Sequence, residues 1–192
     1  MDIRTFSGCA LSYLWLLWTG PAGTQTIFTG TRWGDPPDAP STIGDFDNDG
    51  WPDVFRSGRN NVSARIALMH NEEGVHFSNQ TDRIRAEMPT NRKGGGPLFG
   101  DYDNDGDLDL FIPVGSIWSV ERGRNVLLRN DRGLFTDVTL TAGLTDEFPT
   151  DNAIWLDYDR DGYLDIYTGN VGTTPNDPTV RNKLYRNNGD GT

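Results

Sequence analysis

Asp101-Tyr-Asp-Asn-Asp-Gly-Asp-Leu-Asp109 is the stretch that decides the fold of this chain, because close copies of it stand at Asp45–Asp53 and Asp157–Asp165. The first aspartates of the three copies are 56 residues apart in both intervals. Equal spacing of a rare pattern indicates an internal repeat, and a period of this size corresponds to one supersecondary unit per repeat. We therefore expect a repeat protein with one acidic loop in each unit.

Each acidic loop has the composition of a calcium site. Carboxylates at positions 1, 3 and 5 crowd like charges, which is costly unless a cation relieves the repulsion. Calcium accepts roughly 6–8 oxygen ligands, and the glycine at position 6 permits the turn that brings later oxygens back to the same centre. Position 7 varies chemically, so only its backbone carbonyl is assigned. For about three Ca²⁺ per chain, the predicted ligands are Asp45, Asp47, Asp49, Asp53 and the carbonyl of Trp51; Asp101, Asp103, Asp105, Asp109 and the carbonyl of Asp107; and Asp157, Asp159, Asp161, Asp165 and the carbonyl of Tyr163.

These loops differ from the helical calcium loop. That motif needs a bidentate Glu at position 12, where this chain has Arg56, Ile112 and Thr168. Apolar residues alternate after the loop in Leu108–Val114, and β-branched and aromatic residues at period two are typical of a strand. Each acidic loop should therefore join one strand to another.

The middle repeat shows the expected unit most fully. Strands are predicted at Leu98–Gly100, Leu108–Val114, Asn125–Arg129 and Leu134–Val138, with a turn at Asn130–Gly133. The first repeat has counterparts at Ile66–His70 and Val75–Ser78, and the third at Asn182–Arg186. Four-stranded antiparallel sheets repeated about an axis make a β-propeller. The expected fold is all-β, a partial β-propeller of about three four-stranded blades at residues 41–96, 97–152 and 153–192, the last one truncated, with an acidic loop between the first and second strands of each.

The residues before the repeats have a different character. Cys9–Trp18 is one apolar run, too short to cross a bilayer, and small residues follow it at Gly20–Gly23. This pattern predicts a signal peptide over residues 1–22; a mis-assigned start and a buried strand are the alternatives. Residues 23–40 are expected to be a linker or an outer closing strand. The predicted location is secreted, periplasmic or at the cell surface, with no membrane span.

The charge of the chain limits its partners. A net charge of −11 argues against nucleic acid, whose binding needs the opposite sign. The predicted ligands supply 12 of the 28 acidic residues, so three calcium ions would bring the net charge to −5. With no cysteine left after signal cleavage, calcium would stabilise the fold in place of disulfides.

Two segments resemble a known family. Gly100-Asp-Tyr-Asp-Asn-Asp-Gly-Asp-Leu-Asp-Leu-Phe-Ile112 and Lys183-Leu-Tyr-Arg-Asn-Asn-Gly-Asp-Gly-Thr192 look like FG-GAP/VCBS repeats. The resemblance implies the calcium-binding propeller blades of integrin α-subunit heads and of many secreted bacterial proteins, with the same twelve aspartate ligands. The asparagine-rich turn is most similar to bacterial relatives of cartilage acidic protein, which carry an ASPIC/UnbV domain after the propeller. Gly44 and Gly100 precede the first two loops, whereas Leu156 precedes the third. The chain is expected to be a fragment that lacks the remaining blades.

The sequence offers no ordered catalytic set. His70 and His76 lie in predicted strands and are expected to be structural, and zinc is disfavoured by the lack of cysteines or clustered histidines. The expected function is non-catalytic: a secreted, calcium-binding module for cell adhesion that binds an extracellular protein or glycan. Its candidate contact loops are Ser116–Gly123 and Gly172–Thr179, with Trp118, Arg122 and nearby Arg181. The alternative is the N-terminal propeller of a calcium-dependent polysaccharide lyase or hydrolase, with catalytic residues beyond Thr192.

Overall fold

The structure, a computed structural model, describes residues 14–15, 30–31, 41–57, 66–86, 95–115, 123–172 and 180–192. The chain divides into two compact units, Met1–Asp38 and Ala39–Thr192. In the first unit β1 (Leu14–Trp15) pairs antiparallel with β2 (Gly30–Thr31). The rest of the predicted signal peptide and of the segment 23–40 lies outside the described residues.

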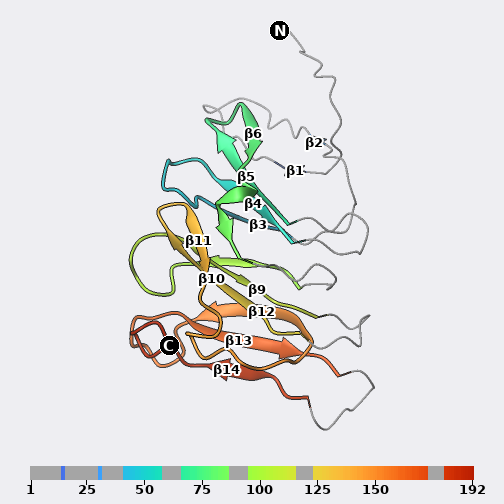
Figure 1. Ribbon diagram of the computed structural model, residues 1–192, viewed down its shortest axis with the longest axis vertical. Coiled ribbons are helices and arrows are strands. Elements are labelled where there is room, and N and C mark those ends of the chain that lie inside the picture. The colour runs from blue at the N-terminus through green and yellow to red at the C-terminus, as the bar shows by residue number, and fades with distance from the viewer. Residues whose placement is uncertain are drawn as a thin grey trace, which may run out of the picture. The chain divides into compact units, whose positions relative to one another are not determined.

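The second unit is all-β, and its described residues form three sheets that follow one another along the chain (Figure 1). The first sheet contains β3 (Ser41–Gly44), β4 (Asp53–Arg56), β5 (Ala67–Glu72) and β6 (His76–Asn79). The second contains β8 (Leu98–Gly100), β9 (Asp109–Ile112), β10 (Val126–Asp131) and β11 (Leu134–Asp137). The third contains β12 (Thr150–Leu156), β13 (Asp165–Asn170) and β14 (Lys183–Tyr185). Neighbours along the chain pair antiparallel within each sheet, which confirms the predicted partial β-propeller.

The second sheet has a fifth strand that the sequence reasoning missed. After the 3₁₀ helix η1 (Thr81–Arg83), β7 (Ile84–Arg85) pairs parallel with β11, with Ile84 opposite Phe135. A strand of two residues has no periodicity that a sequence pattern could reveal. The chain thus leaves the first sheet and adds to the outer edge of the second before it forms β8, which ties the two sheets together. No helix in the described ranges is long and apolar enough to cross a membrane.

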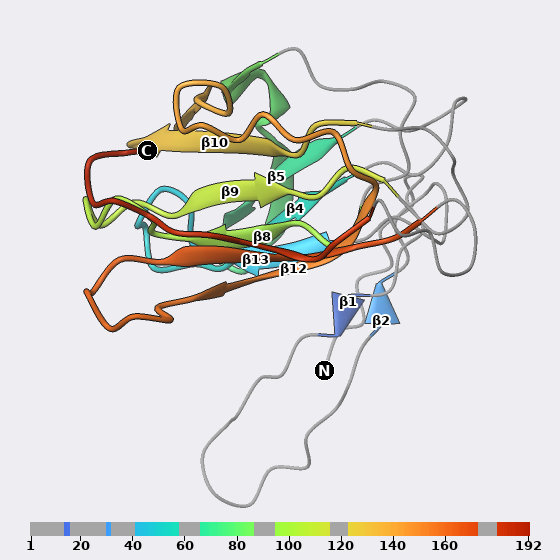
Figure 2. The same cartoon turned by 90° about the horizontal axis from the view of Figure 1, so that it is seen from below.

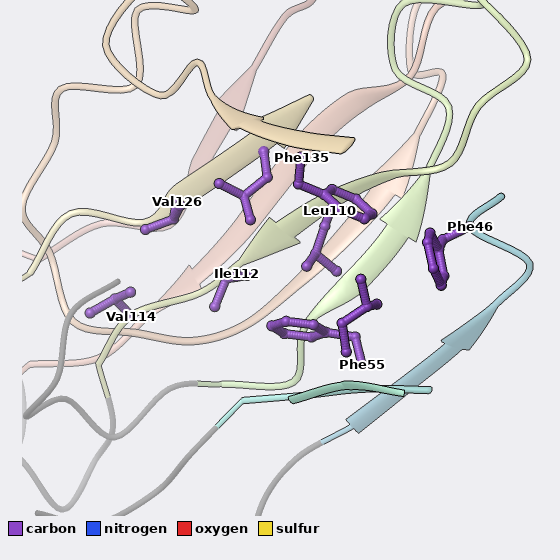
Figure 3. Packing of buried hydrophobic residues seen from close by; sticks show 9 residues of the cluster. Phe46, Phe55, Leu110, Ile112, Val114, Val126 and Phe135 are labelled. Atoms are coloured by element: carbon purple, nitrogen blue, oxygen red, sulfur yellow. The ribbon is translucent and has the colours of Figure 1, made fainter. Parts of the chain in front are cut away.

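The hydrophobic core lies between successive sheets. Figure 3 shows Phe55 of the first sheet facing Leu110 and Ile112 of β9. Successive side chains of a strand point to opposite faces, so Phe111 enters a second cluster, where it meets Ile166 of the third sheet. All four residues of β9 are buried. The second sheet is therefore buried on both faces, as expected of a blade between two others.

The glycines before the first two loops permit close packing between sheets. A Cβ atom on Gly44 would lie 2.8 Å from the ring of Phe99 in the second sheet. A Cβ atom on Gly100 would lie 2.7 Å from the indole nitrogen of Trp155 in the third sheet. Glycine is needed at both positions because an aromatic side chain of the next sheet occupies the space.

Candidate metal centre

The three acidic loops lie side by side at one end of the strands (Figures 1 and 2). Each leaves the first strand of its sheet and returns as the second strand, as the sequence predicts. The glycines at position 6 have φ of 90°, 94° and 93° for Gly50, Gly106 and Gly162. The residue at position 4 is also left-handed, with φ of 59° for both Asn48 and Asn104. Two left-handed residues in one short loop turn the chain tightly enough for its aspartates to converge.

Backbone amides orient the aspartates in the same way in each loop. In the second loop Asp101 accepts hydrogen bonds from the amides of Asp105 and Gly106, each at 3.1 Å. Asp105 in turn accepts from the amide of Asp107 at 2.9 Å. The first and third loops repeat these bonds. Each carboxylate oxygen keeps lone-pair capacity for a cation, because it can accept more than one bond.

The aspartate at position 9 is the buried anchor of each loop. Asp53, Asp109 and Asp165 have no exposed surface. In the second loop Asp109 Oδ2 accepts from the amide of Tyr102 at 3.0 Å, and Oδ1 accepts from the amide of Asn130 at 2.8 Å. The other loops make the same two bonds. The ninth aspartate therefore joins each acidic loop to the third strand of its sheet.

The second and third loops bring aspartates from positions 1, 3 and 9 together. One ligand oxygen each from Asp101, Asp103 and Asp109 lie within 4.8 Å of one another, and Asp157, Asp159 and Asp165 form the same group. The first loop forms two overlapping groups, Asp45–Asp47–Asp49 and Asp47–Asp53–His70, within the same limit. Several groups of the described residues can thus hold a metal ion. Two predicted ligands, Asp105 and Asp161, are not members of these groups. Their role stays a prediction, as does that of the carbonyls of Trp51, Asp107 and Tyr163.

The electrostatics of the loops favour a bound cation. Burial raises the pKa of Asp109 to about 7, and it also raises the pKa values of Asp47, Asp53 and Asp103. Oδ1 of Asp47 and Oδ1 of Asp103 are buried without a hydrogen-bond partner among the described residues. A divalent cation would provide that partner and would favour the ionised carboxylates. The raised pKa values and the oxygens without a partner therefore both fit a bound metal ion.

A basic residue stands opposite the ninth aspartate of each loop in the strand register, which sequence reasoning missed. Extended by one pair, the strand register places His70, Arg129 and Arg186 opposite these aspartates. Arg186 donates to Asp159 at 2.6 Å and to Asp161 at 3.2 Å, and the first bond lowers the pKa of Asp159. Arg129 pairs instead with Asp131 at 3.0 Å. These three residues could have been predicted by pairing the second and third predicted strands of each repeat residue by residue.

Asparagine side chains connect neighbouring repeats. Asn48 Nδ2 in the first loop donates to Asp107 Oδ1 in the second at 2.8 Å, and Asn104 Nδ2 donates to the carbonyl of Gly162 in the third at 3.0 Å. On β10, Asn130 Nδ2 donates to the carbonyl of Phe46 at 2.7 Å, and Asn187, just after β14, makes the equivalent bond to Tyr102. The three acidic loops are therefore linked into one row.

The predicted contact loops are mostly outside the described residues. Of Ser116–Gly123 and Gly172–Thr179 the structure describes only Gly123 and Gly172, so Trp118 and Arg122 are not placed. Arg181 is exposed, and its guanidinium donates to the carbonyl of Val180 at 2.9 Å. The use of these loops as a contact surface stays a prediction.

Comparison with protein families adds one finding. Residues 45–112 match the model of a family described as FG-GAP-like repeat. The matched segment starts at the first aspartate of the first loop and ends with β9, so it includes two of the acidic loops. Curated proteins give no match to this sequence.

Proposed function

Because the chain is an FG-GAP repeat protein with a partial β-propeller fold, we propose that it is a secreted, calcium-binding module for protein or glycan binding. One observation carries the calcium assignment: three loops of the same hydrogen-bonding scheme hold converging carboxylates, and two contain a buried oxygen without a partner among the described residues. Oxygen donors in an irregular loop are what a hard, flexible-geometry cation such as Ca²⁺ prefers.

Calcium would act here as a structural ion. Because the ninth aspartate is bonded to the third strand, an ion bound to Asp109 would hold the acidic loop against β10. An ion that binds only the folded state stabilises it by mass action. Extracellular modules can use weak calcium sites, so the proposed secreted location is compatible with sites of modest affinity.

Binding, and not catalysis, is the role we assign to the propeller. The recurring carboxylate groups of the described residues lie in the loops, where backbone amides orient them for an ion. An ion saturated by oxygen ligands leaves no open position for substrate. We assign partner binding to the side chains of the inter-blade loops, including exposed Arg181.

The third sheet also has an apolar face, which we assign to further repeats of the same propeller. Ile154, Tyr167 and Leu184 form one cross-strand row and are 53%, 37% and 43% exposed. The equivalent row of the second sheet is Leu98, Phe111 and Leu127, and it packs against the third sheet. The exposed row thus has the position by which one blade packs on the next.

Calcium stoichiometry tests the proposal directly. The double variant Asp101→Asn with Asp103→Asn should bind one Ca²⁺ fewer than the wild-type chain in equilibrium dialysis, and its melting temperature in calcium should fall. Asp82→Asn with Asp137→Asn makes the same change of charge at exposed positions outside the loops and should leave the stoichiometry unchanged. Equal calcium binding by the loop variant and the wild type would contradict the ligand assignment, and no binding by the wild type would contradict the function.

A further inference from the structure

The first acidic loop differs chemically from the other two. The side chain opposite its ninth aspartate is His70, where the second and third loops have Arg129 and Arg186. A guanidinium has only donors, whereas a neutral imidazole has a nitrogen lone pair that binds metals. Among the described loops, only the first can therefore offer nitrogen to an ion.

The His70 ring is placed as a ligand would be. Nδ1 lies 3.1 Å from Asp53 Oδ1 and 3.5 Å from Asp47 Oδ2. Metal–ligand bonds of about 2.0–2.2 Å place neighbouring ligand atoms roughly 2.9–3.5 Å apart in octahedral and tetrahedral sites. The ring meets Phe46 edge-on, with centroids 6.0 Å apart, and the side chain is 13% exposed. Packing thus holds Nδ1 toward the carboxylates.

His70 Nδ1 lies within hydrogen-bond distance of Asp53 Oδ1, at 3.1 Å, and a metal ion would take the place of the proton between the two atoms. Both oxygens of Asp53 already accept backbone amides, from Phe46 at 3.0 Å and from Asn71 at 2.8 Å. Asp47 Oδ1, in contrast, is buried without a partner among the described residues. The second ring nitrogen, Nε2, lies 3.7 Å from Asp49 Oδ2 and 3.9 Å from Glu72 Oε2, both beyond hydrogen-bond distance. A metal-bound histidine usually donates its second ring N–H to a carboxylate, and Asp49 and Glu72 are the candidates for that acceptor.

We propose that the first loop binds a divalent transition ion through His70 Nδ1, Asp47 and Asp53, and so has a different metal preference from the other two loops. Imidazole together with carboxylates suits borderline ions such as Zn²⁺, whereas calcium prefers oxygen alone. This inference rests on the proposed metal-binding function of the loops, and it assigns one of the three sites to another class of ion.

Competition between zinc and calcium tests the assignment on the full chain. With Ca²⁺ in excess, the wild type should bind one Zn²⁺ per chain and release one Ca²⁺ in equilibrium dialysis with metal analysis. His70→Asn should weaken Zn²⁺ binding by at least about tenfold, since even outer-shell partners of a metal ligand are worth roughly 10–100-fold in affinity. His76→Asn is the matched control, because His76 is exposed and is the second of the two histidines of the chain.

The outcomes separate this inference from the proposed function. If calcium binds but Zn²⁺ displaces none of it, or if both histidine variants bind Zn²⁺ like the wild type, the His70 assignment is wrong and the calcium function stands. If calcium does not bind at all, the calcium function fails, whatever zinc does.

A second measurement needs no variant. Bound ¹¹³Cd²⁺ should couple to one ¹⁵N-labelled imidazole in the wild type, and absence of that coupling in the cadmium-loaded protein would overturn the proposal.

Discussion

Replacing Asn130 with alanine should show how strongly one repeat is held to the next. The Asn130 side chain is fully buried. Its amide nitrogen donates to the carbonyls of Phe46 in the first loop, at 2.7 Å, and of Leu108, at 3.0 Å. Its oxygen accepts from the amide of Gly133 at 2.7 Å. Asn130→Ala removes all three bonds and leaves the backbone of strand β10 in place.

The expected cost follows from which groups lose their partner. A buried polar group left unsatisfied costs about 1–3 kcal/mol. Phe46 and Gly133 are buried and would each carry this cost, while half-buried Leu108 can regain a partner from water. Asn130→Ala should therefore lower the free energy of unfolding by about 3–5 kcal/mol.

Asn71→Ala is the matched control in the first repeat. Asn71 holds the equivalent place after His70, but in the described structure its amide donates only to the carbonyl of Pro52, at 3.1 Å. Its oxygen accepts from Gly74 at 2.9 Å. Pro52 and Gly74 are both exposed, so water can replace the lost bonds and the cost should stay near 1 kcal/mol.

Urea unfolding in saturating calcium, followed by circular dichroism, measures both variants. The two costs should differ by about 2–4 kcal/mol, with unchanged slopes of the transitions. If the two variants lose the same free energy of unfolding within about 0.5 kcal/mol, the reasoning is refuted. The bond from Asn130 to Phe46 of the neighbouring repeat would then add no stability beyond that of the bonds within one repeat.

Three further predictions concern packing, pH and charge in the loops. Gly100→Ala places its Cβ 2.7 Å from the Trp155 nitrogen. It should lower the free energy of unfolding, measured in urea, by about 1–3 kcal/mol. The control Gly96→Ala, with open space around it, should leave the free energy of unfolding unchanged. Because burial raises the folded-state pKa of Asp109 to about 7 from 3.8, its contribution to the stability of calcium-free protein should be lost as pH rises through 7. Calcium needs the ionised form, so its affinity for that loop should be about 30-fold lower at pH 5.5 than at pH 8, measured by calorimetry. Arg186→Gln should strengthen calcium binding at the third loop by about 2–5-fold, since the guanidinium competes for two of its carboxylates; weaker binding would contradict this.

Most of the fold could be predicted because the strand and turn patterns occur in the same order in each repeat. The predicted strand Leu98–Gly100 coincides with β8, and the predicted turn at Asn130–Gly133 lies where Arg132 and Gly133 adopt φ of 54° and 82°. Position 9 could be assigned as a closing residue from its recurrence alone. Its full burial and its bonds to the third strand could not, because they depend on strand pairing and not on local pattern.

What sequence reasoning missed are contacts between segments far apart in the chain. β7 is too short to show a period, and it becomes a strand because the edge of β11 is available to it. The bond between Asn48 and Asp107 joins residues of two different repeats. His70 lies within a predicted strand and has no local signal, and only the register of β4 and β5 brings it to the first loop.

The three loops illustrate how a repeat can keep its fold and vary its chemistry. The ninth aspartate accepts a backbone amide at 2.8 Å in every repeat, from Asn71, Asn130 and Asn187. This part of the backbone scaffold is therefore the same in the three repeats. The side chain just before each asparagine takes no part in that scaffold: His70 and Arg186 contact loop carboxylates, whereas Arg129 pairs with Asp131. The residue at this place changes from imidazole in the first repeat to guanidinium in the other two, and the charge and the donor atoms that it would offer to an ion change with it. If the first loop prefers a transition ion as proposed, metal preference would be set from the third strand, by a residue that lies outside the acidic motif.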